Sequence, residues 1–194
     1  MGPPDKSTSL TLLERIRDRD EEAWRRLHHL YAPLVSRWCG LKGILGEDAD
    51  DVQQEVFRAV AAGLDNFHRD RDGDSFRGWL RGITRNKIVD HFRRRGAQPE
   101  AQGGTDARRE LEQVAGTELP DESEEEVGGL YRRGLELVRS EFEERTWTAF
   151  WRAAVEGHNP ADIAADLGVT PAAVRKAKSR VLHRLRQELG DLIA

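Results

Sequence analysis

Apolar side chains recur every three or four positions along most of the chain, which is the spacing of an amphipathic helix. This spacing predicts helical segments at residues 10–39, 47–65, 76–95, 129–156 and 158–192. Runs of β-branched residues are scarce, whereas Leu, Ala, Arg and Glu are abundant. The chain is therefore expected to be all-α.

Capping residues mark where several of these helices begin. Asp20 is suited to cap a helix inside the first segment, and Ser75 to cap the helix that starts at residue 76. In the last segment Asn159 is a predicted cap with Pro160 in the first helical position, and Thr170 caps a second helix after a short turn. Two short helices joined by a tight turn predict a helix-turn-helix at the C-terminal end.

The charge is unevenly distributed. Residues 1–95 carry 18 basic and 16 acidic side chains, residues 96–127 carry 2 and 10, and residues 128–194 carry 11 and 9. The middle stretch is also poor in apolar residues and contains Pro99 and two adjacent glycines, so it is interpreted as a flexible acidic linker. The predicted organisation is a helical domain at 9–95, the linker at 96–127, and a helix-turn-helix domain at 128–192.

Composition excludes several classes of protein. Cys39 is the one cysteine, so no intrachain disulfide can form, which fits a reducing cytoplasm. No run of 18 apolar residues and no apolar leader are found, so neither membrane insertion nor a signal peptide is expected. The net charge of −4 argues against a general nucleic-acid binder, although both ends of the chain are mildly basic.

The second helix of the predicted helix-turn-helix carries the clearest binding signal. It has small residues in its first turn, many cations, and no acid between residues 171 and 187. Small or polar residues near bases, with cations for phosphates, suit a recognition helix in a DNA major groove. The alternative is an ordinary solvated face. The candidate DNA contacts are Thr170, Ala172, Ala173, Arg175, Lys176, Lys178, Ser179, Arg180 and Arg184.

Aromatic and basic residues alternate over residues 76–95, which contain seven basic side chains and one acid, Asp90. Such surfaces stack unpaired bases and neutralise their phosphates. The spacing equally favours a core role for Trp79, Leu80, Ile83 and Phe92, and we assign those four to the core. Any binding role then belongs to the polar face of this helix and to the loop before it.

Three segments resemble one family. Residues 76–95, FRGWLRGITRNKIVDHFRRR, resemble the promoter-melting segment of extracytoplasmic-function sigma factors of bacterial RNA polymerase. Residues 48–57, DADDVQQEVF, are similar to their polymerase-binding helix, with Asp51, Gln54, Glu55 and Phe57 at matching positions. Residues 155–185 resemble their upstream-element-binding domain. The resemblance covers nearly everything except the linker.

The resemblance implies a sigma factor that binds core RNA polymerase, recognises a two-part promoter and promotes DNA melting, with no catalysis and no cofactor of its own. It implies duplex DNA at the upstream element, single-stranded DNA at the downstream element, and an anti-sigma factor as a partner to be tested. Implied polymerase contacts are Asp48, Asp51, Gln54, Glu55 and Arg58. Implied downstream-promoter contacts are Phe67, Asp74, Ser75, Arg77, Arg81, Arg85, Asn86, Lys87, Arg93 and Arg94.

The chain departs from the family's common pattern at Ala177 and Lys178, so base preference cannot be transferred to it. It also departs at Gln53, which bears on the rotation of the polymerase-binding helix. A stand-alone helix-turn-helix regulator is the main alternative, but it leaves residues 48–57 and 76–95 without a role. An enzyme with an added DNA-binding tail lacks a catalytic constellation.

Three apparent ligand motifs are set aside. The calcium-like residues 70–74 lack the final bidentate Glu. His28, His29 and Cys39 are too few and badly spaced for zinc. Asp48, Asp50 and Asp51 lack a partner base or nucleophile for catalysis, so a docking face for a basic partner is favoured. No metal is expected.

Overall fold

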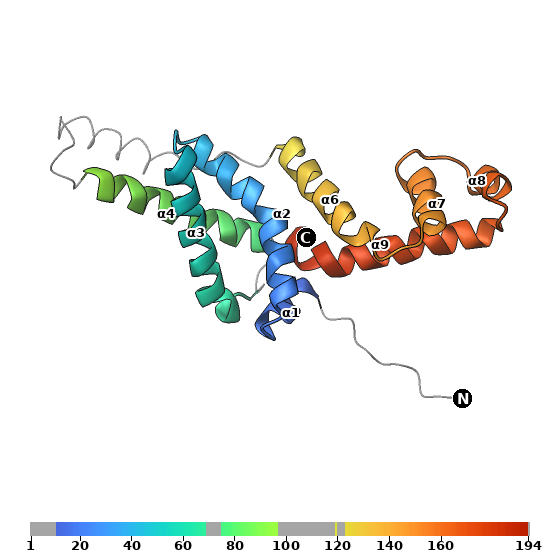
Figure 1. Ribbon diagram of the computed structural model, residues 1–194, viewed down its shortest axis with the longest axis horizontal. Helices are drawn as coiled ribbons and strands as arrows, with labels where there is room; N and C mark the ends of the chain where they lie inside the picture. The colour runs from blue at the N-terminus through green and yellow to red at the C-terminus, as the bar shows by residue number, and fades with distance from the viewer. Residues whose placement is uncertain (1–10, 69–74, 97–118, 120–122, 194) are drawn as a thin grey trace. The chain divides into compact units, whose positions relative to one another are not determined.

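A computed structural model describes residues 11–68, 75–96, 119 and 123–193. The described residues form helices and turns without a strand, which confirms the all-α prediction. The elements are α1 (Leu12–Arg17), α2 (Glu21–Gly40), α3 (Gly46–Gly63), the 3₁₀ turn η1 (Leu64–Asn66), α4 (Phe76–Gly96), α6 (Glu124–Arg139), α7 (Glu144–Ala154), α8 (Pro160–Leu167) and α9 (Pro171–Ile193) (Figure 1).

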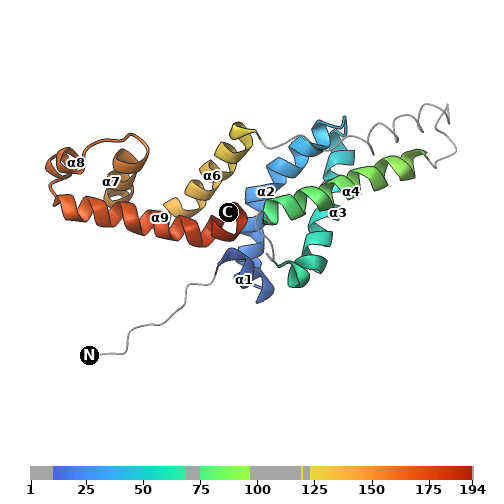
Figure 2. The ribbon, with the colours of Figure 1, turned by 180° about the vertical axis from the view of Figure 1, so that it is seen from behind.

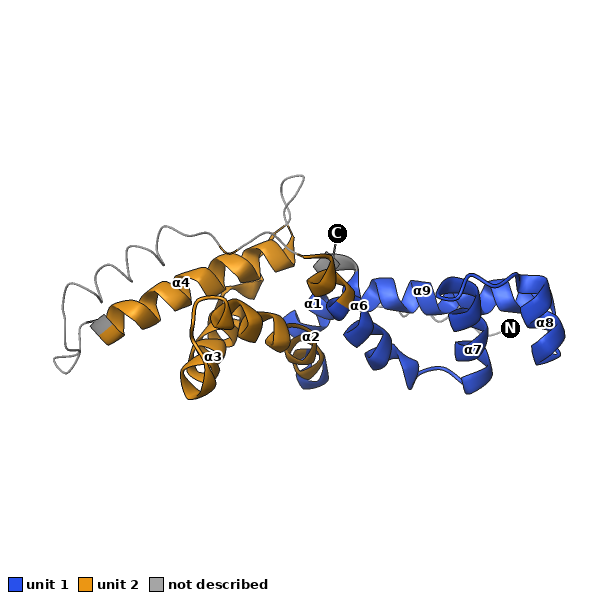
Figure 3. Cartoon of the chain, turned by 90° about the horizontal axis from the view of Figure 1, so that it is seen from above, with its two compact units in different colours: residues 1–23, 129–191 blue, residues 24–128, 192–194 orange. Residues whose placement is uncertain are grey.

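The chain divides into two compact units (Figure 3). Unit 1 comprises residues 1–23 and 129–191, and unit 2 comprises residues 24–128 with 192–194. The division thus groups residues 1–23 with the C-terminal helices. The sequence instead predicted domains at 9–95 and 128–192, and those boundaries stay a prediction.

Unit 2 is built on the packing of α3 against α4, which cross in both ribbon views (Figures 1 and 2). α2 contributes the large side chains Tyr31 and Trp38, both fully buried. Gln53 of α3 donates a hydrogen bond to the Ala32 carbonyl at 3.1 Å and another to Ser36 Oγ at 2.7 Å. This polar residue, unusual for the family, therefore faces α2, and its hydrogen bonds fix the rotation of α3.

An aromatic cluster lies at the start of α4. The Phe76 ring is 5.2 Å from Tyr31, 5.7 Å from Phe67 and 5.7 Å from Trp79, and Phe67 lies 5.0 Å from Trp79. Gly63 leaves room for the Trp79 indole, because a Cβ there would come within 3.0 Å of it. The cluster ties η1 and the start of α4 together.

In unit 1, α7, α8 and the first half of α9 share a small apolar core. Its buried members are Ala149, Ile163, Ala164, Val174 and Ala177. Asn159 and Thr170 cap α8 and α9 through their side-chain oxygens at 2.9 and 3.1 Å, as predicted. Gly168 ends α8 with a φ of 61°, a left-handed conformation that suits glycine.

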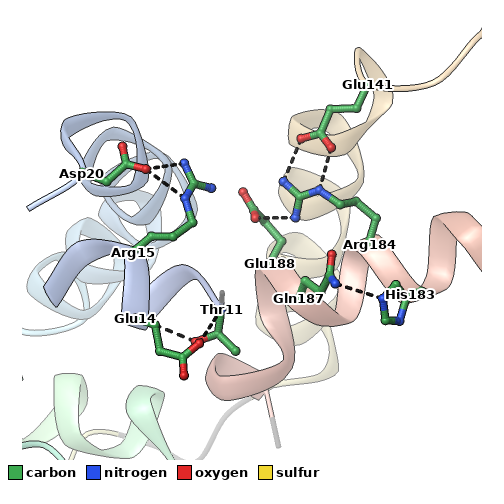
Figure 4. A network of polar contacts seen from close by, with 9 residues as sticks. All are labelled: Thr11, Glu14, Arg15, Asp20, Glu141, His183, Arg184, Gln187 and Glu188. Atoms are coloured by element: carbon green, nitrogen blue, oxygen red, sulfur yellow. Dashed lines mark hydrogen bonds and ion pairs between the residues drawn. The ribbon is translucent and has the colours of Figure 1, made fainter. Parts of the chain in front are cut away.

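The second half of α9 packs against α6. A Cβ on Gly134 would overlap Leu189 Cδ1 and lie 3.1 Å from its Cγ, so the two helices cross at a point where only glycine fits. Beside this crossing, Arg184 lies between Glu141 and Glu188, at 2.6 and 2.8 Å (Figure 4). The Glu188 carboxylate is buried, and this pairing compensates its charge.

Two of the predicted helical segments are interrupted. Segment 10–39 breaks into α1 and α2, with Arg19 at a φ of 60° and Asp20 capping α2, as predicted for that residue. Segment 129–156 breaks into α6 and α7 between residues 139 and 144. The cap at Asp20 had indicated the first interruption, whereas the apolar pattern of residues 129–156 gave no sign of the second.

α6 begins five residues earlier than predicted, inside the stretch interpreted as linker. Ser123 and Glu126 form a capping box, in which Ser123 N–H donates to the Glu126 carboxylate at 3.0 Å and Glu126 N–H to Ser123 Oγ at 3.2 Å. Glu126 also pairs with Arg37 of α2 at 3.0 Å within unit 2. Acids in a first helical turn are stabilising, so the acidic run starts a helix here.

Candidate nucleic-acid interface

The first turns of α9 present a polar face opposite their buried side. Val174, Ala177 and Val181 point into the core of unit 1. The exposed predicted contacts are Thr170, Ala172, Ala173, Arg175, Lys176, Lys178, Ser179 and Arg180. Small residues at the start of the helix and cations one turn later lie on one solvent-facing side, the arrangement that a DNA groove requires.

Two predicted contacts on α9 also contact other parts of unit 1. Lys178 Nζ lies 3.5 Å from the Ala153 carbonyl at the end of α7, where a cation is favourable. The Arg184 guanidinium is held by Glu141 and Glu188, and these carboxylates raise its pKa while burial opposes them. Arg184 is half-buried and joins α9 to the turn after α6, whereas Lys178 is exposed.

Two arginines of α7 support the turn before α9. Arg145 donates to the carbonyls of Leu167 and Gly168, which end α8. Arg152 pairs with Asp166 at 2.7 Å. Neither arginine was predicted from the sequence, because only the fold brings α7 beside that turn.

The predicted polymerase-binding residues lie on α3. Asp48, Asp51, Gln54 and Arg58 are exposed, and the Gln54 amide oxygen accepts from Arg58 at 3.2 Å. Phe57, also matched to the family motif, is buried against Trp24 and His28. The helix thus presents polar residues outward and apolar residues inward.

Glu55 differs from its neighbours on α3 because it bridges to α4. Its Oε1 accepts from Arg94 at 2.7 Å, and its Oε2 lies 3.9 Å from Lys87 Nζ. The hydrogen bond from Arg94 holds the pKa of the Glu55 carboxyl below its usual value, and the same bond raises the pKa of Arg94. Two turns toward the N-terminus, Asp48 lies 3.8 Å from Arg95.

The predicted downstream-promoter residues fall in three environments. Arg85, Asn86, Arg93 and Arg94 are exposed on α4, whereas Ser75, Arg77, Arg81 and Lys87 are half-buried. Ser75 caps α4, as predicted, by accepting from Gly78 N–H at 3.0 Å. The Phe67 ring is buried in the aromatic cluster. Asp74 and the calcium-like residues 70–74 lie outside the described residues.

Of the four α4 residues assigned to the core, one is buried and three are half-buried. Leu80 is fully buried, and Phe92 is half-buried. Ile88 is buried one turn before Phe92. The Trp79 ring belongs to the aromatic cluster, and Ile83 lies one turn after it on the same helix. The apolar period of α4 therefore describes the side of the helix that packs within unit 2.

A hollow of about 530 Å³ between α6 and α7 was not anticipated. Trp147 and Trp151 stack at 6.2 Å along its floor, and Arg139 lies over the Trp147 ring at 5.9 Å. Trp151 is exposed despite its size. The aromatic residues at 147, 150 and 151 are visible in the sequence, but their period alone favours a core role.

The residues that the structure describes contain neither a membrane-spanning helix nor a metal-binding cluster. None of the helices in that part of the chain is long and apolar enough to cross a membrane. Across the same residues, no group of three or more His, Cys, Asp or Glu side chains is arranged to hold a metal ion.

Comparison with known proteins places the chain in a family. Residues 27–98 match the family described as sigma-70 region 2. The ECF RNA polymerase sigma factor SigE of Mycolicibacterium smegmatis is 29% identical over 194 residues, which cover 99% of this chain and 70% of SigE. The ECF RNA polymerase sigma factor SigD of Mycobacterium tuberculosis is 30% identical over 176 residues, covering 88% and 78%. The RNA polymerase sigma factor CarQ of Myxococcus xanthus is 27% identical over 182 residues, covering 93% and 97%.

These matches extend over both units, and the described part of the chain is all-α. The resemblance noted in residues 48–57, 76–95 and 155–185 is confirmed at the level of the family. The chain belongs to the ECF RNA polymerase sigma factors of the sigma-70 family.

Proposed function

We propose that the chain binds core RNA polymerase through α3, directs it to a two-part promoter, and promotes melting of the DNA. The observation that carries this proposal is the polar face of α9. Arg175, Lys176 and Ser179 are exposed opposite the buried stripe that begins at Val174. A rigid helix with this face fits the major groove of the duplex upstream element, with Ala172 and Ala173 near base edges.

The downstream element is held as a single strand by α4 and the loop before it. Arg85 and Asn86 are exposed on α4 after its capped start. A base flipped from the stack would sit in the loop at residues 66–76, beside these two side chains. Unstacking costs a few kcal/mol, which the binding energy of polymerase offsets. The Phe67 ring is buried against Phe76 and Trp79, so it supports the start of α4 rather than stacking on DNA.

Polymerase binds the exposed residues of α3, with Asp51 and Gln54 at the centre. Their side chains are exposed, while Val52 and Val56 on the opposite side of the helix are buried. Replacing exposed side chains changes stability by about 0.5 kcal/mol or less, so binding can be tested without unfolding the unit.

The acidic linker crosses the path that RNA later takes through the polymerase. Residues 124–127 belong to α6, and the remaining residues 96–123 carry a net charge of −5, which favours an extended chain and suits a basic channel. Replacing Asp121, Glu122, Glu124, Glu125 and Glu126 by Ser should weaken polymerase binding and alter the ratio of abortive to full-length transcripts. Because Glu126 also caps α6, and both Glu125 and Glu126 pair with Arg37, a second variant that keeps Glu125 and Glu126 separates the two effects.

The polymerase performs the covalent chemistry, and this chain needs no cofactor for its part. The alternative function, a stand-alone regulator that binds duplex DNA, accounts for α9 but not for the match of residues 27–98 to sigma-70 region 2.

Polymerase binding is tested with the double variant Asp51→Arg, Gln54→Ala. Core polymerase should not pull down the double variant. It should still pull down Asp65→Arg, which makes the same change of charge at an exposed residue of unit 2. Wild-type binding by the double variant, with unchanged circular dichroism, would remove α3 from the interface.

Upstream binding is tested on α9. Arg175→Ala with Lys176→Ala should lower the slope of log affinity against log salt by roughly 0.9 for each phosphate that α9 no longer neutralises. Arg132→Ala, an exposed change on α6, serves as the control. An unchanged slope would show that Arg175 and Lys176 contact solvent and not DNA phosphates.

A further inference from the structure

The proposed polymerase face and the proposed DNA face of unit 2 are joined by ion pairs. Glu55 on α3 accepts from Arg94 on α4 at 2.7 Å and lies 3.9 Å from Lys87. Arg94 and Lys87 are both assigned to the downstream strand, whereas Glu55 is assigned to polymerase. One carboxylate thus contacts two cations that are needed for another partner.

The surroundings of Glu55 favour a role inside the chain. Its side chain is 23% exposed, whereas Asp51, one turn earlier on α3, is exposed to solvent. Arg94 is 59% exposed and is further held by a hydrogen bond from its Nε to the Asp90 carbonyl at 3.3 Å. The Glu55 carboxylate therefore faces α4, and the Arg94 guanidinium lies between that carboxylate and solvent.

Carboxylate and phosphate compete for the same donors. A guanidinium binds either anion through charge-assisted hydrogen bonds of similar geometry. While Glu55 holds Arg94 and Lys87, a phosphate must either displace the carboxylate or bind two cations whose positive charge the carboxylate partly neutralises. A basic group of polymerase that binds the neighbouring Asp51 would bring positive charge close to Arg94 and Lys87 and weaken their ion pairs with Glu55.

We propose that Glu55 is a positioning residue that holds Lys87 and Arg94 against α3 in the free chain, which weakens their binding to single-stranded DNA until polymerase occupies α3. This inference rests on the proposed function, because it takes Lys87 and Arg94 as contacts to the downstream strand. It assigns Glu55 a different role from Asp51 and Gln54, although all three lie in one motif.

The test measures binding of the free, full-length chain to a fluorescent single-stranded oligonucleotide by anisotropy at low salt. Glu55→Gln removes the charge and keeps the shape. Exposed ion pairs are worth up to about 1 kcal/mol, so affinity should rise about two- to fivefold. Glu47→Gln is the matched control, because it removes the same charge from an exposed position in the first turn of α3.

Two further measurements separate a release of cations from a general change of charge. Adding Arg94→Ala to Glu55→Gln should remove most of the gain in affinity. Core polymerase should bind Glu55→Gln nearly as well as the wild type. If circular dichroism shows that Glu55→Gln is unfolded, Glu55→Asp, whose shorter side chain draws the carboxylate away from Arg94, is measured in the same way.

The proposal is overturned if Glu55→Gln gains no more affinity than Glu47→Gln. It is equally overturned if Glu55→Gln loses polymerase as completely as Asp51→Arg with Gln54→Ala, because Glu55 is then a direct contact. The proposed function fails separately, if Arg94→Ala leaves promoter opening by the polymerase complex unchanged. The two failures are therefore read from different variants and different assays.

Discussion

Replacing Gly134 by alanine should loosen the crossing of α6 and α9. The new methyl group would overlap Leu189 Cδ1 and lie 3.1 Å from its Cγ, and Leu189 is only 2% exposed. The leucine cannot swing into solvent without leaving the core, so either its rotamer or the helix spacing must change. Overpacking of this kind costs about 1–3 kcal/mol.

Helix propensity works in the opposite direction and must be removed from the comparison. Alanine is favoured over glycine inside a helix by about 1 kcal/mol. Gly128 lies in the same helix, and a Cβ there would have no neighbour within 4 Å. Gly128→Ala should therefore show the propensity gain alone, and the stability difference between the two variants should equal the steric cost, about 1–3 kcal/mol.

The assay is hydrogen exchange of the full-length chain, read by mass spectrometry on peptides from α6 and α9. Exchange resolves local opening, so the two units need not unfold together. Protection of α9 near Leu189 should fall in Gly134→Ala and stay or rise in Gly128→Ala. Adding Leu189→Ala to Gly134→Ala should cost less than the sum of the two single changes, because the methyl group then has space. Equal protection in both alanine variants would refute the tight crossing.

Three other outcomes are expected. Cys39 is fully buried, and burial raises the pKa of its thiol to about 11. At pH 8 a thiol reagent should therefore label Cys39 only after the chain unfolds, and the absorbance of the released chromophore measures the labelling. Hydrogen bonds from Arg15 and Arg94 hold the pKa values of Asp20 and Glu55 below 3.8 and 4.5. The stability that these carboxylates add is present above those values and is lost as the pH falls through the lowered pKa. The double variant Asp20→Asn, Glu55→Gln lacks both carboxylates. In thermal melts its melting temperature should therefore fall less than that of the wild type between about pH 5 and pH 3. Arg145→Ala removes the donor to the Leu167 and Gly168 carbonyls, so it should weaken binding to upstream duplex DNA in a titration while polymerase pull-down is unchanged.

The helical period predicted most of the fold because each helix buries one side. The capping residues Asp20, Ser75, Asn159 and Thr170 all act as predicted, since a cap is a local interaction between neighbours in sequence. The early start of α6 was missed although its signal, Ser123 followed by Glu126, was present. The acidic composition of residues 96–127 outweighed that short motif.

The direction of individual charged side chains was harder to predict. Arg184 was grouped with the DNA contacts because it lies in a basic helix, yet in the structure it pairs with Glu141, 43 positions away. Glu55 was grouped with Asp51 by motif, but it pairs with Arg94, 39 positions away. These partners are distant in sequence, so only the tertiary fold decides which cations face solvent.

Run-off transcription with purified core RNA polymerase on a promoter library, with and without this chain, tests the proposed sigma-factor function at its centre. Discrete transcripts are expected only when the chain is added. Their templates should share two sequence elements about two helical turns apart, and the transcripts should disappear with Asp51→Arg, Gln54→Ala. The same transcript pattern with and without the chain, together with sequence-specific binding of duplex DNA by the chain alone, would contradict this function and identify a stand-alone regulator.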